Sequence, residues 1–188
     1  DDFEAVLGAG WRARLGMTQE EFHAALAAID PGKLAETGQL SEAGYAARCA
    51  ACLGFSPAQQ EEFIADLWDW YCGELDVELV DFVAGLRPAY RTGILSNSAD
   101  GARREEQARY GFEDLVDTVI YSHEVGLAKP DPRIYRLACD QLGVEPHEMV
   151  FLDDVPQIVA GAAEFGIRAV LHRSTPESIA AIREILTY

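Results

Sequence analysis

The sequence predicts an α/β fold in which helices cover both faces of a parallel sheet, giving a three-layer α/β/α core beside a smaller all-helical part. From about residue 78 onward, short apolar runs alternate with helical patterns, and this alternation is typical of parallel sheets. The first half shows helical spacing only, with no convincing strand before residue 90. Apolar residues make up 49% of the 188 residues, which is enough for a packed core.

The helices of the first half are predicted from their start signals. Thr18 is followed three residues later by Glu21, which is the spacing of a capping box. Ser41 is placed to begin a second helix, and Ser56 followed by Pro57 to begin a third. Each start precedes apolar residues at helical spacing, so three amphipathic helices are expected before residue 73.

The second half is predicted to alternate between strands and helices. Strands are expected at 92–95, 118–121, 149–152 and 169–171, and helices at about 78–86, 99–109, 132–142, 156–165 and 176–186. In sheets of this kind, ligands bind beyond the carboxyl ends of the strands. The residues that directly follow each strand are therefore the first candidates for chemistry.

Composition excludes several classes of partner and location. The net charge of −17 argues against nucleic acid and anionic membranes, because both require a basic surface. No apolar run approaches the ~20 residues of a membrane span, and no secretory signal is recognisable. The four cysteines are too few and too scattered for a disulfide framework. A soluble cytoplasmic protein with reduced thiols is expected.

Three segments at predicted strand ends carry residue types that phosphoryl transfer requires. Ser96 and Asn97 follow the first strand, where a hydroxyl and backbone N–H groups can hold a phosphate oxygen. Lys129 follows the second strand and offers a compact positive charge. Asp153 and Asp154 follow the third, and two adjacent carboxylates suit a hard cation such as Mg²⁺. Taken singly, each segment also fits a helix cap, a solvated lysine or a surface acid.

Together these segments resemble three sequence motifs of the haloacid dehalogenase superfamily. The matching segments are Leu95-Ser96-Asn97, Gly126-Leu127-Ala128-Lys129-Pro130-Asp131-Pro132 and Phe151-Leu152-Asp153-Asp154, with Ile134-Tyr135, Gly161-Ala162 and Phe165-Gly166-Ile167 as fitting context. The resemblance is close over residues 79–172, and Glu36–Ser41 is similar to a turn common in the family's helical caps. It implies a small helical cap at residues 3–77 and a Rossmann-like core at 78–188.

The resemblance also implies a function and a role for each residue. The protein is expected to be a Mg²⁺-dependent hydrolase of a small phosphorylated metabolite, with sugar phosphates among the candidates. Ser96 is expected to bind the transferring phosphoryl group, and Asn97 to contact phosphate or substrate. Lys129 is expected to stabilise the nucleophile and the phosphate. Asp154 is expected to coordinate Mg²⁺, and Asp153 to support the lysine or the metal.

The family's first motif, an Asp-x-Asp pair that supplies the nucleophile, is not recognisable in the sequence. Asp1 and Asp2 are not taken for it, because a helical pattern follows them at once. The nucleophile is therefore expected upstream of residue 1, and the 188 residues are interpreted as part of a longer protein. By themselves, the 188 residues are expected to lack phosphatase activity. The strand carrying that motif is the central one of the fold, so a gap is expected between the Ser96 and Asp153 strands.

Alternative interpretations remain for the function and for several residues. A 2-haloacid dehalogenase shares the fold but typically lacks the acid pair at Asp153. A non-catalytic binding or regulatory protein is the alternative if the first motif is truly absent. Cys49 and Cys52 have redox-motif spacing but are interpreted as structural, and Trp68, Trp70 and Tyr71 chiefly as packing residues that can also line the substrate side of the cap. His123 follows the second strand and is a minor candidate for the site.

Overall fold

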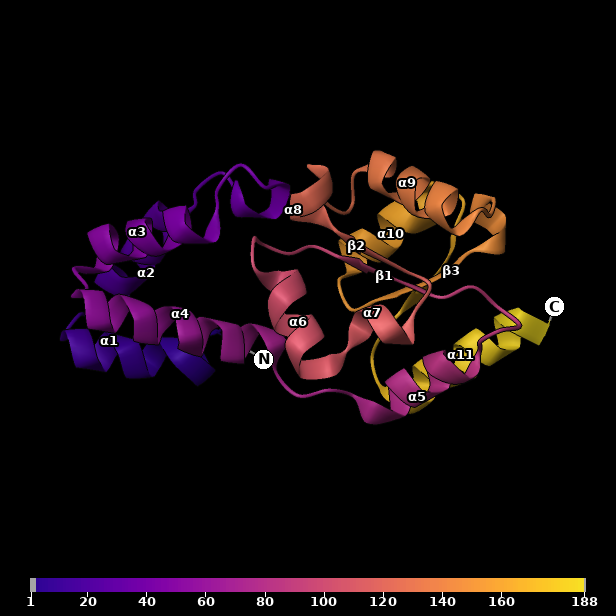
Figure 1. The fold of residues 1–188 in the computed structure, drawn as a ribbon, viewed down its shortest axis with the longest axis horizontal. Helices are drawn as coiled ribbons and strands as arrows, with labels where there is room; N and C mark the ends of the chain where they lie inside the picture. The colour runs from indigo at the N-terminus through magenta and orange to yellow at the C-terminus, as the bar shows by residue number, and fades with distance from the viewer. Residues whose placement is uncertain (1–2, 188) are drawn as a thin grey trace.

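The computed structural model describes residues 3–187 (Figure 1). Asp1 and Asp2 lie outside the described residues, as does Tyr188. Among the described helices, none is long and apolar enough to cross a membrane.

The first half folds into a helical lobe, defined here as residues 3–72. Its elements are the π-helix η1 (Glu4–Gly8), α1 (Ala9–Leu15), α2 (Gln19–Ile29), the 3-10 helix η2 (Ala35–Thr37), α3 (Glu42–Leu53) and α4 (Pro57–Cys72). The predicted start signals are confirmed. The Thr18 side chain accepts from the backbone N–H of Glu21 while the Glu21 side chain accepts from that of Thr18, and Ser56 and Gln59 make the same capping box at α4. Buried Trp11, Phe22 and Phe63 anchor the core of the lobe.

The second half contains the strands and the helices that cover them. Its elements are α5 (Val77–Gly85), β1 (Gly93–Ser96), α6 (Ala102–Tyr110), α7 (Phe112–Leu115), β2 (Thr118–Tyr121), α8 (Ser122–Val125), α9 (Pro132–Leu142), the 3-10 helix η3 (Pro146–Glu148), β3 (Val150–Asp153), α10 (Pro156–Glu164), β4 (Arg168–Leu171) and α11 (Thr175–Thr187). The predicted α/β alternation is confirmed. One boundary is wrong, since residues 97–101 form a loop and the helix expected from residue 99 begins at Ala102.

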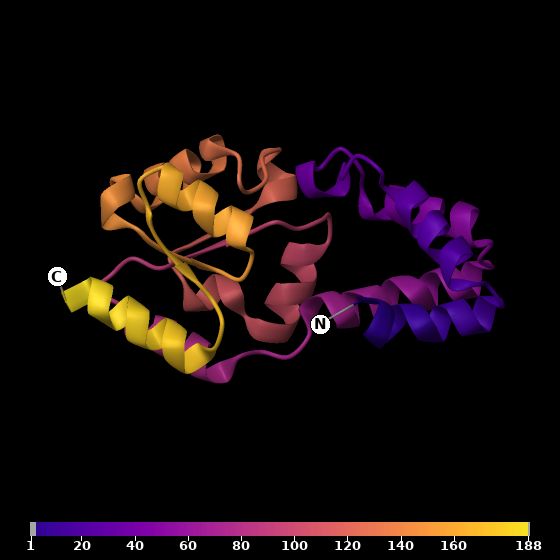
Figure 2. The ribbon, with the colours of Figure 1, turned by 180° about the vertical axis from the view of Figure 1, so that it is seen from behind.

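Helices lie on both sides of the strands, as the three-layer prediction requires. α9 and α10 lie on one side, whereas α5 and α11 lie side by side on the other (Figures 1 and 2). The main apolar cluster joins β2, α9, α10 and the residues that directly precede β3 and β4, through buried residues that include Ile120, Ile134, Tyr135 and Ala162. This shared core fixes the two strand pairs relative to each other. The fold is a Rossmann-like α/β arrangement.

The strands form two parallel pairs rather than one continuous sheet. β1 pairs with β2 in the register Ser96↔Tyr121, and β3 pairs with β4 in the register Asp153↔Leu171. Within the described residues, β1 and β3 have no hydrogen-bonded strand between them. A cavity of about 660 Å³ separates the pairs, and Ile94 and Leu95 of β1 face Phe151 and Leu152 of β3 across it. The gap expected between these strands is therefore present, and we call it the interstrand groove.

Candidate active site at the strand ends

The predicted site residues come from three separate segments that meet at the carboxyl ends of β1 and β3. Ser96 is the last residue of β1 and Asp153 the last residue of β3. Lys129 lies in the loop between α8 and α9. Parallel strands bring residues from distant parts of the chain to one edge in this way.

A buried ion pair forms the centre of the site. The Nζ atom of Lys129 lies 2.7 Å from Oδ2 of Asp153, and the two side chains are only 9% and 7% exposed. The other carboxylate oxygen, Oδ1, accepts from the backbone N–H of Val155 at 2.9 Å. A buried charge pair needs good geometry and further hydrogen bonds to offset the loss of hydration, and here the short contact and the Val155 N–H supply these for Asp153.

Asn97 holds the backbone that carries the lysine. Its side-chain amide donates to the carbonyl oxygen of Lys129 at 2.9 Å, and its Oδ1 accepts from the N–H of Lys129 at 2.8 Å. This two-bond arrangement fixes the position of Lys129 relative to β1. The geometry therefore gives Asn97 a positioning role that sequence reasoning, which expected a phosphate or substrate contact, did not anticipate.

Ser96 is in contact with the helical lobe through Tyr71 of α4. The Tyr71 hydroxyl lies near the side chains of Ser96 and of Glu106 in α6, and both influence its pKa. Glu106 accepts from the hydroxyl of Tyr121 at 2.5 Å. Burial raises the pKa of the Glu106 carboxyl and also that of the Tyr71 hydroxyl. The helical spacing of Tyr71 indicated packing, and only the fold reveals that its hydroxyl reaches a strand end.

His123 lies beside the loop that follows Ser96. Its Nδ1 shares a hydrogen bond of 2.9 Å with the Ser98 hydroxyl, and Ser98 N–H donates to the Ser122 hydroxyl at 2.9 Å. Burial lowers the pKa of the His123 imidazole. The turn around Gly38, in the helical lobe, also approaches His123. A Cβ at Gly38 (φ 71°) would lie 2.1 Å from the carbonyl oxygen of His123, so only glycine fits this contact.

The acid pair after β3 is divided between two environments. Asp153 is buried in the pair with Lys129, whereas Asp154 is exposed and has no hydrogen bond or ion pair with the other described residues. Within residues 3–187, no group of three or more His, Cys, Asp or Glu side chains is arranged to hold a metal ion. Mg²⁺ usually takes one or two carboxylates together with waters and a substrate phosphate. Asp154 therefore fits as one ligand of such an ion, but not as a complete protein cage.

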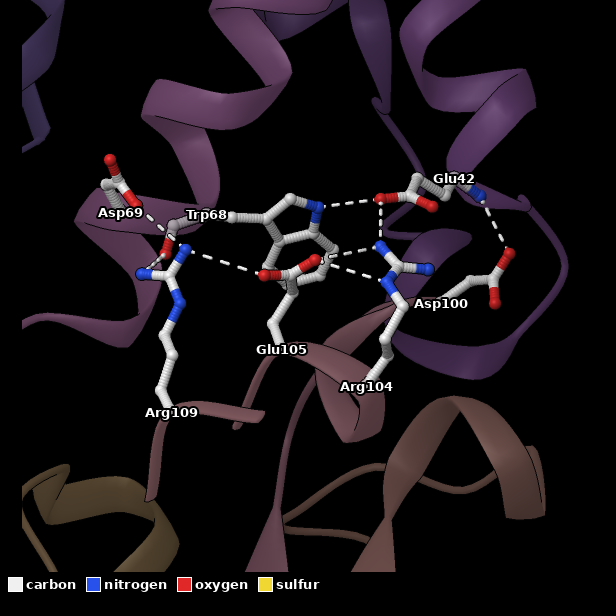
Figure 3. Close-up of polar contacts among 7 residues, drawn as sticks. All are labelled: Glu42, Trp68, Asp69, Asp100, Arg104, Glu105 and Arg109. Carbon is white, nitrogen blue, oxygen red and sulfur yellow. Dashed lines mark hydrogen bonds and ion pairs between the residues drawn. The ribbon is translucent and has the colours of Figure 1, made fainter. Parts of the chain in front are cut away.

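A polar network joins the helical lobe to α6 above the site (Figure 3). We call it the lobe–core network, and it comprises Glu42, Trp68, Asp69, Asp100, Arg104, Glu105 and Arg109. Oε1 of Glu42 accepts from the Trp68 indole at 2.7 Å and from Arg104 at 2.8 Å. Arg109 donates to Asp69 at 2.7 Å. The network is largely open to solvent: the side chain of Arg104 is 59% exposed and that of Asp69 is 72% exposed.

A second cavity of about 390 Å³, the interlobe cavity, lies between the helical lobe and the loop after β1. The loop side of its wall contains Asn97, Ser98 and Asp100. The lobe side contains Tyr71 and Trp68, which also contribute to the contacts described above. The cavity therefore opens beside the strand-end residues, and it is the space in which a bound molecule would contact both parts of the protein.

Comparison with known proteins identifies the family. The family model of the haloacid dehalogenase-like hydrolases matches residues 3–166. A bifunctional epoxide hydrolase 2 from Sus scrofa is 36% identical over 103 residues, covering 53% of this chain and 19% of that protein. A phosphoserine phosphatase from Thermus thermophilus is 39% identical over 92 residues (46% and 37%). An (S)-2-haloacid dehalogenase 4A from Burkholderia cepacia is 35% identical over 81 residues (43% and 35%). The aligned stretches thus span well under half of these relatives.

Solved structures support the fold. A HAD-family enzyme from Bacteroides thetaiotaomicron matches with a TM-score of 0.72 and 23% identity, over 85% of this chain and 80% of that one. Another structure of that enzyme, described as a complex with magnesium and inorganic phosphate, matches with a TM-score of 0.67 and 23% identity over 74% and 73%. At this level of identity, the likeness concerns the fold.

Proposed function

We propose a phosphatase function for this chain, which belongs to the haloacid dehalogenase-like hydrolase family. The reaction is Mg²⁺-dependent hydrolysis of a phosphomonoester of a small metabolite, through an aspartyl-phosphate intermediate. The single observation that carries the proposal is the buried Lys129–Asp153 pair, positioned by Asn97 at the carboxyl ends of β1 and β3, where Ser96 also lies. This edge provides a fixed positive charge and a hydroxyl where a phosphoryl group would bind.

Each residue has a role in this proposal. The Lys129 ammonium offsets negative charge that develops on the phosphoryl oxygens, and Asp153 holds that ammonium in position. The Ser96 hydroxyl, which lies near Tyr71, donates to a phosphoryl oxygen once substrate is bound. Asp154 is the proposed Mg²⁺ ligand, and a bound Mg²⁺ would neutralise phosphate charge and orient the group for in-line displacement.

The attacking carboxylate is proposed to come from a further strand seated in the interstrand groove. The groove lies between the unpaired edges of β1 and β3, and buried strand edges of this kind need hydrogen-bonding partners. A parallel strand there would end beside Lys129 and Ser96. Its aspartate oxygen would attack phosphorus as the bond to the alcohol oxygen breaks. The leaving alcohol oxygen would take its proton from a second carboxylic acid on that strand. This group, then a carboxylate, would accept a proton from the water that hydrolyses the acyl phosphate.

Dehalogenase activity is the second candidate, since both kinds of enzyme are among the relatives. Two observations favour the phosphatase. The exposed Asp154 carboxylate suits a metal, which dehalogenation does not require. A 2-haloacid also carries a carboxylate, and Lys33, the one cationic residue among the described residues that line the interlobe cavity, is paired with Glu36 at 3.5 Å.

We assign the helical lobe and its link to α5, residues 3–77, to a cap over the site, and residues 78–188 to the catalytic core. The proposal rests on the interlobe cavity and on the contact between Tyr71 and Ser96. A non-catalytic binding protein would keep the same architecture. Turnover of a generic aryl phosphate by the full-length protein that contains these residues would exclude it.

The metal assignment is tested with Asp154→Asn in the full-length protein. Because Asp154 is exposed and has no partner among the described residues, the substitution should leave thermal stability almost unchanged. It should raise the Mg²⁺ concentration needed for half-maximal activity at least about tenfold and lower kcat, because one carboxylate ligand is lost. Asp140→Asn, at an exposed position at the end of α9, is the matched control. Unchanged Mg²⁺ dependence in Asp154→Asn would contradict the assignment.

A further inference from the structure

The interlobe cavity has an unusual combination of an apolar wall and an acidic surround. The apolar wall comes mainly from the helical lobe and consists of Leu26, Leu40, Tyr45, Ile64, Leu67, Trp68, Trp70 and Tyr71. Tyr45, Trp68, Trp70 and Tyr71 are aromatic. A bound group therefore needs an apolar face of its own to replace the water that this wall excludes.

The charged residues of the cavity are predominantly negative. Asp30, Glu36, Glu42 and Asp100 line it, against Lys33 alone. The Lys33 side chain is 78% exposed and already paired with Glu36. Its ammonium is therefore solvated and partly neutralised, and it contributes little positive potential inside the cavity.

The hydrogen bonds of the acids keep their negative charge in place. Asp30 accepts from the backbone N–H groups of Leu34 and Ala35 at 2.8 and 2.9 Å. Asp100 accepts from the N–H of Glu42 through one oxygen only. Glu42 itself is offset by Arg104, as Figure 3 shows. Asp30 and Asp100 thus remain uncompensated by any cationic side chain among the described residues, on opposite parts of the wall.

From these observations we infer that the interlobe cavity binds the alcohol portion of the phosphomonoester and selects it by charge. The preferred alcohol has an apolar face and is uncharged or cationic, whereas an alcohol that carries a carboxylate or a second phosphate is rejected. The inference rests on the proposed function. The phosphoryl group would remain at Ser96 and Lys129, outside the acidic surround, and Asn97 and Ser98 mark the border between the two subsites.

Electrostatics gives the direction of the selection. A cation gains from the carboxylates and from the aromatic faces, since ammonium groups are attracted to the faces of Trp and Tyr rings. An anion meets the partly buried Asp30 carboxylate and the exposed Asp100 carboxylate, neither of which has a cationic partner among the described residues. We expect these like-charge contacts to discriminate about tenfold. The selection acts on the transition state and therefore on kcat/KM.

The test uses three esters that share a two-carbon alcohol and differ only in the end group. These are ethyl phosphate, O-phosphoethanolamine and 2-phosphoglycolate, with 4-nitrophenyl phosphate as a general phosphatase substrate. The full-length protein is assayed with Mg²⁺, and kcat/KM is measured for each. We expect 2-phosphoglycolate to be at least about tenfold worse than ethyl phosphate, and O-phosphoethanolamine to be equal to it or better.

A substitution pair separates charge selection from size or shape selection. Leu67→Lys places an ammonium on the cavity wall and should improve 2-phosphoglycolate relative to O-phosphoethanolamine at least about fivefold. Ala65→Lys adds the same charge to an exposed position of α4 outside the wall and should leave the ratio unchanged. Thermal unfolding of both variants shows whether they fold, and the ratio within each variant is independent of the fraction that is active.

The outcomes distinguish the two proposals. Turnover of 4-nitrophenyl phosphate with 2-phosphoglycolate equal to or better than ethyl phosphate would overturn the charge selection and leave the phosphatase function intact. An unchanged ratio in Leu67→Lys would also overturn it. Absence of turnover for all four esters would overturn the phosphatase function and the inference with it.

Discussion

The strand-end site and the lobe–core network both rely on ion pairs, but they place them in opposite environments. At the strand ends, Lys129 and Asp153 are 9% and 7% exposed and held by further hydrogen bonds. In the lobe–core network, Arg104 and Glu42 are 59% and 28% exposed. A buried pair cannot lose one partner without leaving an unpaired charge, whereas an exposed pair is replaced by water at little cost. The first arrangement preserves geometry, and the second permits the helical lobe to move.

Removing one partner of the buried pair should have the largest effect on stability. Asp153→Asn leaves the Lys129 ammonium without its carboxylate in a buried position, and the free energy of unfolding should fall by about 3–5 kcal/mol. Denaturant unfolding followed by far-UV circular dichroism measures this change. The double variant Lys129→Met with Asp153→Leu removes both charges and should be less destabilised than Asp153→Asn. If both variants lost the same stability, the cost would reflect packing rather than the unpaired charge.

The Tyr71 hydroxyl should contribute less to stability than the buried ion pair and more than the lobe–core network. Tyr71→Phe removes a hydroxyl that lies near Ser96 and Glu106, while Glu106 keeps its hydrogen bond from Tyr121. Loss of about 1 kcal/mol is expected, together with a rise in KM as the loop after β1 loses its contact with the helical lobe. Tyr110→Phe is the control, because the Tyr110 hydroxyl donates to the Gly73 carbonyl in an exposed setting. Equal effects of the two variants would show that the position of Tyr71 confers no special importance.

The lobe–core network should contribute less to stability than the Lys129–Asp153 pair or the Tyr71 hydroxyl, and its contribution should depend on salt. Arg104→Gln removes the charge that offsets Glu42, and the free energy of unfolding should fall by less than about 1 kcal/mol. The fall should shrink further at 1 M salt, where exposed charges are screened over about 3 Å. Because Glu42 also accepts from the Trp68 indole, the fluorescence of Trp68 should change in the same variant.

Arg133→Gln provides the control for Arg104, since Arg133 pairs with Asp131 at the start of α9, away from the helical lobe. It should leave tryptophan fluorescence unchanged. A salt-independent loss of several kcal/mol in Arg104→Gln would contradict the view that the network is a weak and reversible contact.

The same contrast explains which features the sequence could predict. Capping at Thr18 and Ser56 and the period of the apolar residues act within a few positions, so the helices follow from local pattern. Lys129 and Asp153 could be named because parallel strands bring their ends to one edge. The hydroxyl of Tyr71 and the clamp made by Asn97 depend on distances between segments 25 to 32 residues apart, which no local pattern encodes.

The division of the strands into two pairs is a second feature that local pattern does not predict. The four apolar runs predict four strands, and all four are present. Which strands pair depends on edges that meet only after the chain folds. The gap between β1 and β3 was expected from the resemblance to a family, not from the residues that line it. Family resemblance thus supplied the long-range information that periodicity lacks.

The smallest effect concerns pH and the contact between His123 and Ser98. Burial lowers the pKa of His123 from its ordinary value of 6.5, so the unfolded chain binds a proton more readily than the folded one as pH falls below about 6.5. The contribution of His123 is therefore fully favourable at neutral pH and is lost as pH falls from about 6.5 through the lower, folded-state pKa. His123→Asn removes this titration, so the stability difference between His123→Asn and the unsubstituted protein should depend on pH over this interval and be constant above it. His147→Asn, at an exposed position in η3, is the control for the loss of an imidazole. Chemical unfolding at pH 5.0, 6.0 and 7.5 measures the difference. A difference that does not vary with pH would contradict this prediction. It would mean that water reaches the His123 imidazole freely, and that the loop after β1 is as exposed to solvent as the lobe–core network.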